Sequence, residues 1–249
     1  MPRAVLILAP WAAIVAVWYV IHYSGFVNPA LVPTPHEVGR RFWELAGQRL
    51  PLDVWMSTQR VFLGVTVGIL LAVPVGFVLG WYREIRGFID PLINFFRALP
   101  PIALIPLVIV YFGVEETAKV VILFYASFFA GVIVMYEGIA QISPIYVRVA
   151  RTLGARDAEI FLKVIVPLTV PHMLTALRVA LGVAWATLVA SELIAARQGL
   201  GSLIQNAASF FQLDIIYVGI ICIGFIALAM DLLIRKVARR LVAWQERIA

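Results

Sequence analysis

The chain has 249 residues, of which 63% are hydrophobic and 14% are charged, and its mean hydropathy is +0.97. A soluble domain carries about a quarter charged residues, so this composition excludes a fold surrounded only by water and indicates a single membrane domain over residues 1–249. The formal charge of +6 could suit nucleic acid. Because lysine and arginine also gather on the cytoplasmic side of membrane proteins, we expect membrane lipid and no nucleic acid as the partner.

Cysteine and histidine usage excludes two further classes of site. The single cysteine, Cys222, lies in an apolar run, which rules out an internal disulfide and a cysteine metal cluster. The three histidines are scattered without the spacing that metal ligands show, so we expect no metal site.

Six apolar segments could cross a bilayer, for which a helix needs about 20 apolar residues. The third segment is short and contains three prolines, so we expect it to be bent or partly unwound among its neighbours. The first could instead be a cleaved signal peptide, although no small-residue cleavage site follows its long apolar core. The six segments are residues 4–22, 54–81, 100–112, 119–139, 167–196 and 215–234.

Lysines and arginines fall mostly on one side of these six segments, namely the side that also holds both termini. This bias predicts that both termini are cytoplasmic. Arg97, which precedes the third segment, is then also expected on the cytoplasmic side. On the outer side, three prolines lead into a run whose apolar residues recur at helical spacing from Val38 to Ala46, which predicts a short amphipathic helix; an ordinary loop is the alternative. Glycines and alanines four residues apart, from Gly64 to Gly76, would let helices approach closely.

A charged segment, residues 143–166, interrupts the apolar middle of the chain. A serine and a proline at its start predict a helix, and Gly154 permits a left-handed residue at which that helix can stop and turn. A second short helix would follow, with Asp157 and Glu159 near its amino end, and Pro167 would open the next span. Such a rigid pair could sit in a groove on another protein, or it could be a surface loop that merely follows the charge bias.

This segment resembles the cytoplasmic motif of bacterial ABC importer permeases. That motif consists of a Glu-Ala-Ala triplet, three further residues, a glycine, nine further residues and a final Ile-x-Leu-Pro. Arg148–Val149–Ala150 takes the triplet and Gly154 the glycine, while 164–167 supplies the ending, although arginine and valine replace the usual glutamate and alanine. The resemblance implies an all-α, six-helix type I importer fold in which 143–166 is the coupling helix. It assigns contact with the ATPase to Arg148, Ala150, Arg151, Gly154, Ala155, Arg156, Asp157 and Glu159.

The likeness extends along the chain. The runs "LVPTPHEV", "RALPPIALIPLVIVYFGVEETAK" and "LGVAWATLVASELIAARQGLG" are similar to permeases of taurine, sulfonate and nitrate importers, and taurine permeases look nearest. The resemblance implies a homodimer in a bacterial cytoplasmic membrane, two cytoplasmic ATPase subunits and a periplasmic or lipid-anchored solute-binding protein. ATP and magnesium would belong to the ATPase partner.

The chain lacks the residues for ATP chemistry of its own. A phosphate-binding loop ends in Gly-Lys-Ser/Thr, and none of the three lysines follows a glycine. We find no nucleophile triad and no paired catalytic carboxylates, so we expect a permease that is not an enzyme and holds no cofactor.

The fifth span carries the candidate pathway residues. Arg178 lies near mid-membrane with no carboxylate recognised at its depth, and it could either attract an anion or pin one span to carbonyls of another. Leu181, Trp185 and Glu192 follow on its face, as a pathway wall or as packing residues and an interfacial anchor. The run from Gly199 to Gln212 could be an interfacial helix that closes the outer mouth.

The resemblance therefore implies the permease of an importer for taurine or a related sulfonate, working by alternating access. The alternatives are a permease for nitrate or another small solute, a secondary transporter that works alone, and a structural membrane scaffold. The secondary transporter should show titratable pairs at mid-span.

Overall fold

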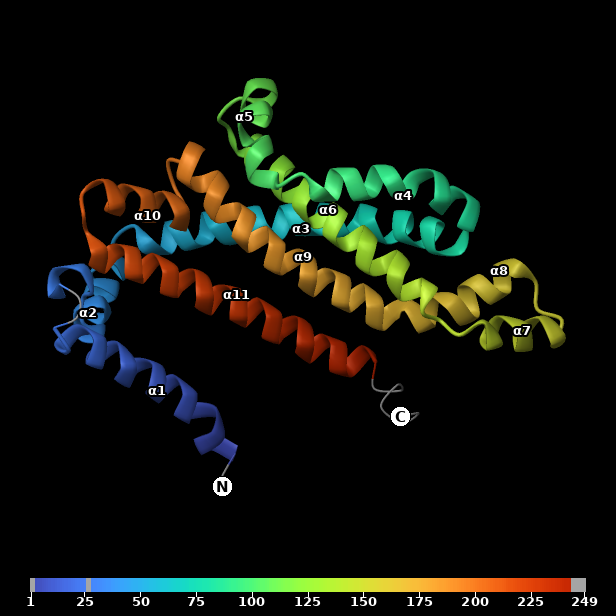
Figure 1. Ribbon diagram of the computed structural model, residues 1–249, viewed down its shortest axis with the longest axis horizontal. Coiled ribbons are helices and arrows are strands. Elements are labelled where there is room, and N and C mark those ends of the chain that lie inside the picture. The colour runs from blue at the N-terminus through green and yellow to red at the C-terminus, as the bar shows by residue number, and fades with distance from the viewer. Residues whose placement is uncertain (1–2, 26–27, 243–249) are drawn as a thin grey trace. The chain divides into compact units, whose positions relative to one another are not determined.

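The computed structural model describes residues 3–25 and 28–242, excluding the side chains of residues 3–7 and 195, and the elements in this part of the chain are all helical (Figure 1). The predicted all-α class is confirmed. The chain forms two compact units, each built from two stretches of sequence. Unit 1 comprises residues 1–57 and 192–224, and unit 2 comprises residues 58–191 and 225–249.

Unit 1 contains α1 (Arg3–Tyr23), a 3-10 turn (Pro29–Leu31), α2 (Pro35–Ala46), α10 (Leu200–Ser209) and the first residues of α11 (Leu213–Leu241). The predicted amphipathic helix is thus α2. It begins where Thr34 and Glu37 form a reciprocal cap, with the Thr34 amide donating to the Glu37 carboxylate at 2.8 Å. The indole N–H of Trp18 donates to the Pro33 carbonyl at 3.0 Å and so ties α1 to the segment before α2.

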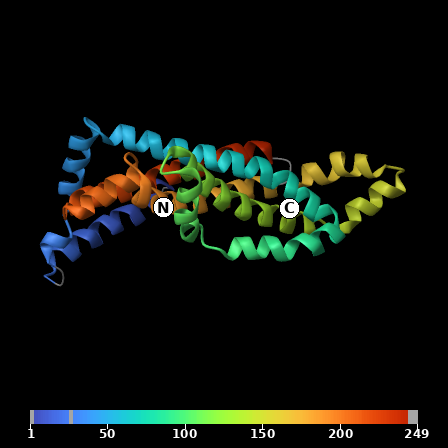
Figure 2. The same ribbon diagram turned by 90° about the horizontal axis from the view of Figure 1, so that it is seen from above.

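Unit 2 contains most of α3 (Leu50–Trp81) and α9 (Val166–Ala195), together with α4 (Arg83–Ala98), α5 (Pro101–Phe112) and α6 (Glu116–Ala140). Two shorter elements, α7 (Pro144–Thr152) and α8 (Asp157–Ile160), complete it with the π-helical turn Phe161–Ile165 and the end of α11. Both views show α7 and α8 doubling back on each other (Figure 1 and Figure 2).

Four helical runs are long and apolar enough to cross a membrane, namely Leu50–Trp81, Glu116–Ala140, Asp157–Ile194 and Leu213–Leu241. The pair α4 and α5 adds a fifth when it is taken as one span broken by a 90° bend, and Leu8–Tyr23 is a shorter apolar helix. The bend predicted for the third segment is confirmed. The broken span starts earlier than expected, however, so Arg97 lies in the last turn of α4 beside the break.

Small residues explain why α3 and α6 pack so closely. A Cβ atom added to Gly68 would lie 2.7 Å from the Ser127 Cβ atom, and Gly64 and Gly76 face Leu123 and Met135 in the same way. Only glycine fits at these positions of α3, because any side chain would overlap α6. Small residues allow membrane helices to approach each other closely in this way. The core of unit 2 continues from this seam through Phe77, Met135, Ile139, Ile160 and Ala176, and so joins α3, α6, α8 and α9.

Candidate functional site

The hinge segment, residues 143–166, is built from a capped helix and a glycine turn. The Ser143 hydroxyl accepts from the Ile145 amide at 3.4 Å, so α7 begins where the sequence predicts. At its other end the Ala155 amide donates to the Ala150 carbonyl and the Gly154 amide to the Arg151 carbonyl, each at 3.0 Å. These two bonds with a φ of +81° at Gly154 form a Schellman stop. The predicted glycine turn is confirmed.

Beyond Gly154 the chain differs from the prediction of two separate short helices. The helix that begins at Asp157 continues through the π-helical turn into α9 as one run to Ile194. Proline at 167 has no amide proton, and its ring would meet the carbonyl four residues earlier in a regular helix. The π-helical turn Phe161–Ile165 lies at that place and widens the helix, so the run passes the proline without a break. The second helix of the hinge segment is therefore the start of the span itself.

The hinge segment has a buried face and an exposed apolar face. Ala150 and Ile160 are 9% and 0% exposed and pack into the core of unit 2, while contact of Ala150 with the ATPase stays a prediction. Val149 and Leu153 remain 52% and 82% exposed. Ile145 and Tyr146 share this exposure at about half of their surface. These four side chains form an apolar row that the described part of the chain leaves uncovered.

Charged residues surround this apolar row. Arg151 pairs with Asp157 at 3.1 Å across the glycine turn, and the Glu159 carboxylate accepts from the Arg156 amide at 3.2 Å. Lys163 donates to the same Glu159 carboxylate at 3.1 Å, and a negative charge at the start of a helix is favourable. Ion pairs on the surface contribute little stability. Arg148, Arg156 and Asp157 are exposed.

Arg178 has a carboxylate partner that the sequence reading missed. Its guanidinium donates to Asp231 of α11 at 2.7 Å, and Arg235 donates to the other oxygen of the same carboxylate at 2.6 Å. The expectation of an arginine without a carboxylate at its depth is therefore wrong. The structure supports the pinning role, although with a carboxylate on α11 in place of backbone carbonyls.

The other predicted pathway residues are buried. Leu181 and Trp185 are each 4% exposed, in unit 2. Glu192 is 1% exposed and belongs to unit 1, where the Ser57 hydroxyl donates to its carboxylate at 2.8 Å and the Gly201 amide donates at 2.8 Å. Their proposed role as a pathway wall stays a prediction.

Glu192 takes part in a buried polar cluster at the amino end of α10. The Leu200 amide donates to the Ser57 hydroxyl at 2.9 Å, and the Gly199 amide donates to Asp53 at 2.8 Å. Three acceptors thus satisfy the first amides of α10, which would otherwise lie buried without partners. The cluster fixes the start of α10 within unit 1, while closure of an outer mouth by this helix stays a hypothesis.

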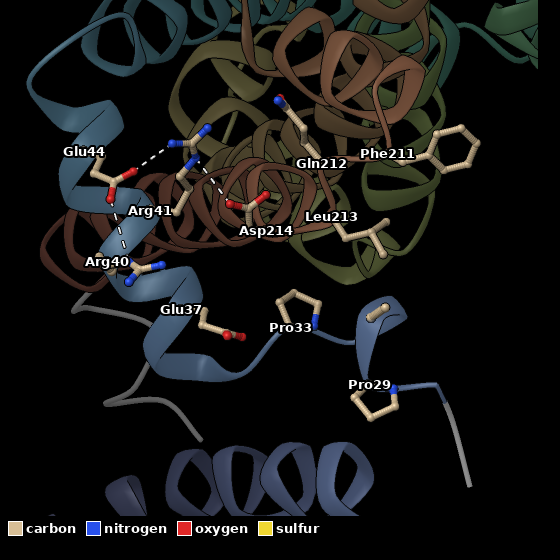
Figure 3. A pocket seen from close by; sticks show the side chains of 11 residues that line it. Pro29, Pro33, Glu37, Arg40, Arg41, Glu44, Phe211, Gln212, Leu213 and Asp214 are labelled. Carbon is tan, nitrogen blue, oxygen red and sulfur yellow. Dashed lines mark hydrogen bonds and ion pairs between the residues drawn. The ribbon is translucent and has the colours of Figure 1, made fainter. Parts of the chain in front are cut away.

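Unit 1 also holds an open cavity of about 490 Å³ beside α2 and the start of α11 (Figure 3). Arg41 lies on its wall between two carboxylates, Glu44 at 2.7 Å and Asp214 at 3.3 Å. Phe211 stands at the rim with 88% of its surface exposed and a φ of +53°, a strained value for a residue other than glycine. Its arginines are paired with carboxylates of the same wall, and the Glu37 carboxylate accepts hydrogen bonds from Thr34.

Comparison with known proteins identifies the family. Residues 64–243 match the sequence profile of the binding-protein-dependent transport system inner membrane component. The chain belongs to this family. A probable ABC transporter permease protein of Brucella abortus is 44% identical over 92% of this chain and 91% of its own length.

Two further relatives are named as parts of particular transport systems. The taurine transport system permease protein TauC of Escherichia coli is 33% identical over 99% of this chain and 92% of its own. The putative aliphatic sulfonates transport permease protein SsuC of Bacillus subtilis is 31% identical over 94% and 85%. A chain from a structure of the MetNI methionine ABC transporter matches the fold with a TM-score of 0.70 at 18% identity, covering 77% of this chain and 95% of the other.

As an ABC importer permease, the chain is a multi-pass inner-membrane component and not an enzyme, and ATP hydrolysis belongs to a separate subunit in these systems. Those expectations are confirmed, as is the type I importer fold. Sequence reasoning missed Asp53, Ser57 and Asp231. Asp53 and Ser57 lie four residues apart on one face of α3, and this polar spacing in an apolar helix was a usable signal.

Proposed function

We propose that this permease imports taurine or a related small sulfonate by alternating access, driven by a separate ATPase that docks on the hinge segment. The observation that carries the docking part is the exposed apolar row of α7, with Val149 and Leu153 uncovered beside ionised side chains. A partner that covers this row would gain apolar burial, and the surrounding charges would orient it. The resemblance of this segment to a coupling helix supports the same partner.

The hinge segment is suited to transmit force because its elements are continuous with a span. Ala150 and Ile160 anchor it in the core of unit 2, and α8 runs into α9 through the π-helical turn. A movement of the docked ATPase would therefore act directly on α9. In this proposal the segment lies in the cytoplasm with both termini, and a second copy of the chain completes the pathway.

The choice of solute rests on the relatives. Both named relatives above belong to systems for sulfonates, taurine in one and aliphatic sulfonates in the other. A bicarbonate transport system permease protein, CmpB of Synechococcus elongatus, is 30% identical over 77% of this chain. The named solutes of all three systems carry an anionic group, and in the first two that group is a sulfonate.

A secondary transporter that works alone is the second candidate. It requires a titratable pair within the spans, and Arg178 with Asp231 supplies one at 2.7 Å. Membership in a family of binding-protein-dependent systems favours the ATP-driven importer. The pair then serves packing between α9 and α11.

The test is reconstitution of the permease with its ATPase and solute-binding protein in liposomes. We expect uptake of radiolabelled taurine or ethanesulfonate that needs both ATP and the binding protein. Uptake that runs on an ion gradient without ATP would favour the secondary transporter. Uptake of nitrate or bicarbonate but of no sulfonate would retain the permease and reject the proposed solute.

A further inference from the structure

A second cavity, of about 310 Å³, lies wholly in unit 2 at the break between α4 and α5. Arg97 and Pro101 flank the break on one side of it. Tyr125 and Phe129 of α6 form another side, and Val179 and Val183 of α9 form a third. The volume falls at the small end of the range for ligand pockets, about 300–1,000 Å³. It suits a solute of a few heavy atoms.

Arg97 is the one charged residue among the described residues that line this cavity. Two other arginines of the spans are neutralised by carboxylates of unit 2. Arg60 donates to Glu116 at 2.5 Å, and Arg178, next to Val179 in the sequence, donates to Asp231 at 2.7 Å. Arg97 has no carboxylate beside it on the cavity wall as the structure describes that wall. The cavity therefore presents a net positive charge.

The position of Arg97 makes this charge unusual. Arg97 lies in the last turn of α4, beside the 90° bend between α4 and α5. Taken together, these two helices are apolar enough to span a membrane. An ionisable residue inside a span, at the break of a discontinuous helix, is a common way to hold an ionic solute. The Tyr125 hydroxyl donates its proton to the Phe96 carbonyl, so Arg97 is the residue of the described wall that carries charge.

We propose that this cavity binds a small organic anion on its way through the permease, with the anionic group on Arg97 and a short tail against Phe129, Val179 and Val183. A sulfonate with a tail of two carbons fits this chemistry. The inference rests on the proposed function for its choice of sulfonate, but the charge of the cavity can be measured without transport.

The experiment measures how fast a cysteine in the cavity reacts with two reagents of opposite charge. Cys222 is replaced by serine, Val183 by cysteine, and the full chain is placed in nanodiscs with its ATPase. The probes are 2-sulfonatoethyl methanethiosulfonate, itself a small sulfonate, and its trimethylammonium counterpart. A change in thiol reactivity affects both reagents equally, so the ratio of the two rates reports the local charge.

We expect Arg97→Gln to lower the anion-to-cation rate ratio at least about tenfold, because a charged cleft concentrates counter-ions by that order. Arg97→Lys keeps most of the ratio. Arg83→Gln removes the same charge from an exposed position of α4 outside the cavity and leaves the ratio unchanged. Val179→Cys repeats the measurement if the first cysteine variant does not assemble. Ethanesulfonate, a sulfonate with an apolar two-carbon tail, should slow the reaction when Arg97 is present and not in Arg97→Gln.

Each outcome has a defined meaning. An unchanged ratio in Arg97→Gln overturns the inference and leaves Arg97 with a structural role at the carboxyl end of α4. A lowered ratio without protection by taurine or ethanesulfonate retains the anion cavity and rejects a sulfonate as its occupant. A lowered ratio in a chain whose complex imports no sulfonate retains the cavity and rejects the proposed function.

Discussion

The Arg178 guanidinium and the Asp231 carboxylate lie 2.7 Å apart and join α9 to α11 within unit 2. In the wild-type chain, Asp231→Asn leaves Arg178 without a charged partner. The same substitution should therefore cost less unfolding free energy when it is made in the Arg178→Gln variant. We expect a coupling of about 1 kcal/mol, the scale of polar pairs between membrane helices. A double-mutant cycle of unfolding in detergent measures it, and additive effects would show that the pair is not coupled.

Gly154 tests the turn of the hinge segment. Alanine there meets no atom within 4 Å, so its cost comes from the φ of +81° alone, about 1–2 kcal/mol. We expect Gly154→Ala to reduce the stimulation of ATPase activity by the loaded binding protein, and Gly154→Asn to retain more of it because asparagine tolerates this conformation.

The matched control is Gly87→Ala, at a helical glycine of α4 that also has open space around it. It should leave stimulation unchanged and stabilise α4 slightly. Equal stimulation in Gly154→Ala, Gly154→Val and the wild-type complex would contradict a role for this turn.

Gly199 and Glu192 give a third prediction. A Cβ atom at Gly199 would lie 2.5 Å from a Glu192 carboxylate oxygen, and the residue also has a φ of +129°. Gly199→Ala must therefore displace the buried carboxylate that holds the start of α10. We expect a loss of more than about 3 kcal/mol of unfolding free energy.

Gly113→Ala separates strain from displacement. Gly113 has a φ of +75°, and a Cβ atom added there would lie 4.0 Å from the Glu115 side chain. Its cost should be limited to about 1–2 kcal/mol of backbone strain. Equal losses for the two variants would show that the polar cluster does not need the glycine.

Glu37 gives a pH dependence. Hydrogen bonds from the Thr34 hydroxyl and amide lower the pKa of Glu37 from its ordinary 4.5. A group whose pKa is lower in the folded state stabilises that state above its unfolded pKa, and this contribution is lost as the pH falls through the folded pKa. The difference in unfolding midpoint between wild type and Glu37→Gln should therefore be constant above about pH 5 and shrink below pH 4.5.

Thr34→Ala should return the pKa of Glu37 toward 4.5, which a pH series on that variant measures. A pH profile of Thr34→Ala identical to that of wild type would mean that the cap does not shift this carboxylate.

The long apolar helices, the bent third span and the turn at Gly154 could be predicted from the sequence because each depends on local features. Apolar length sets a span, prolines bend it and a glycine permits the left-handed stop. The continuity of α8 with α9 could not be predicted, since a π-helical turn before Pro167 depends on how the helix packs.

The partner of Arg178 lies 53 positions away, in a helix whose apolar run hid Asp231. The cluster at Glu192 depends on Ser57, 135 positions distant. Charge counting placed Arg97 on the cytoplasmic side before the third segment, because the amphipathic α4 is not apolar enough to be recognised as part of a span. Pairings between distant helices need the packed structure.

The central claim is that a separate ATPase covers the exposed apolar row of α7. Its most direct test is the alkylation rate of Leu153→Cys in a Cys222→Ser background, measured with a water-soluble maleimide in the permease alone and in the purified complex with its ATPase. Val114→Cys, 58% exposed between α5 and α6, is the control. We predict that the complex slows alkylation at position 153 at least about tenfold and leaves position 114 unchanged. An active complex in which Cys at 153 reacts as fast as in the permease alone would contradict the account.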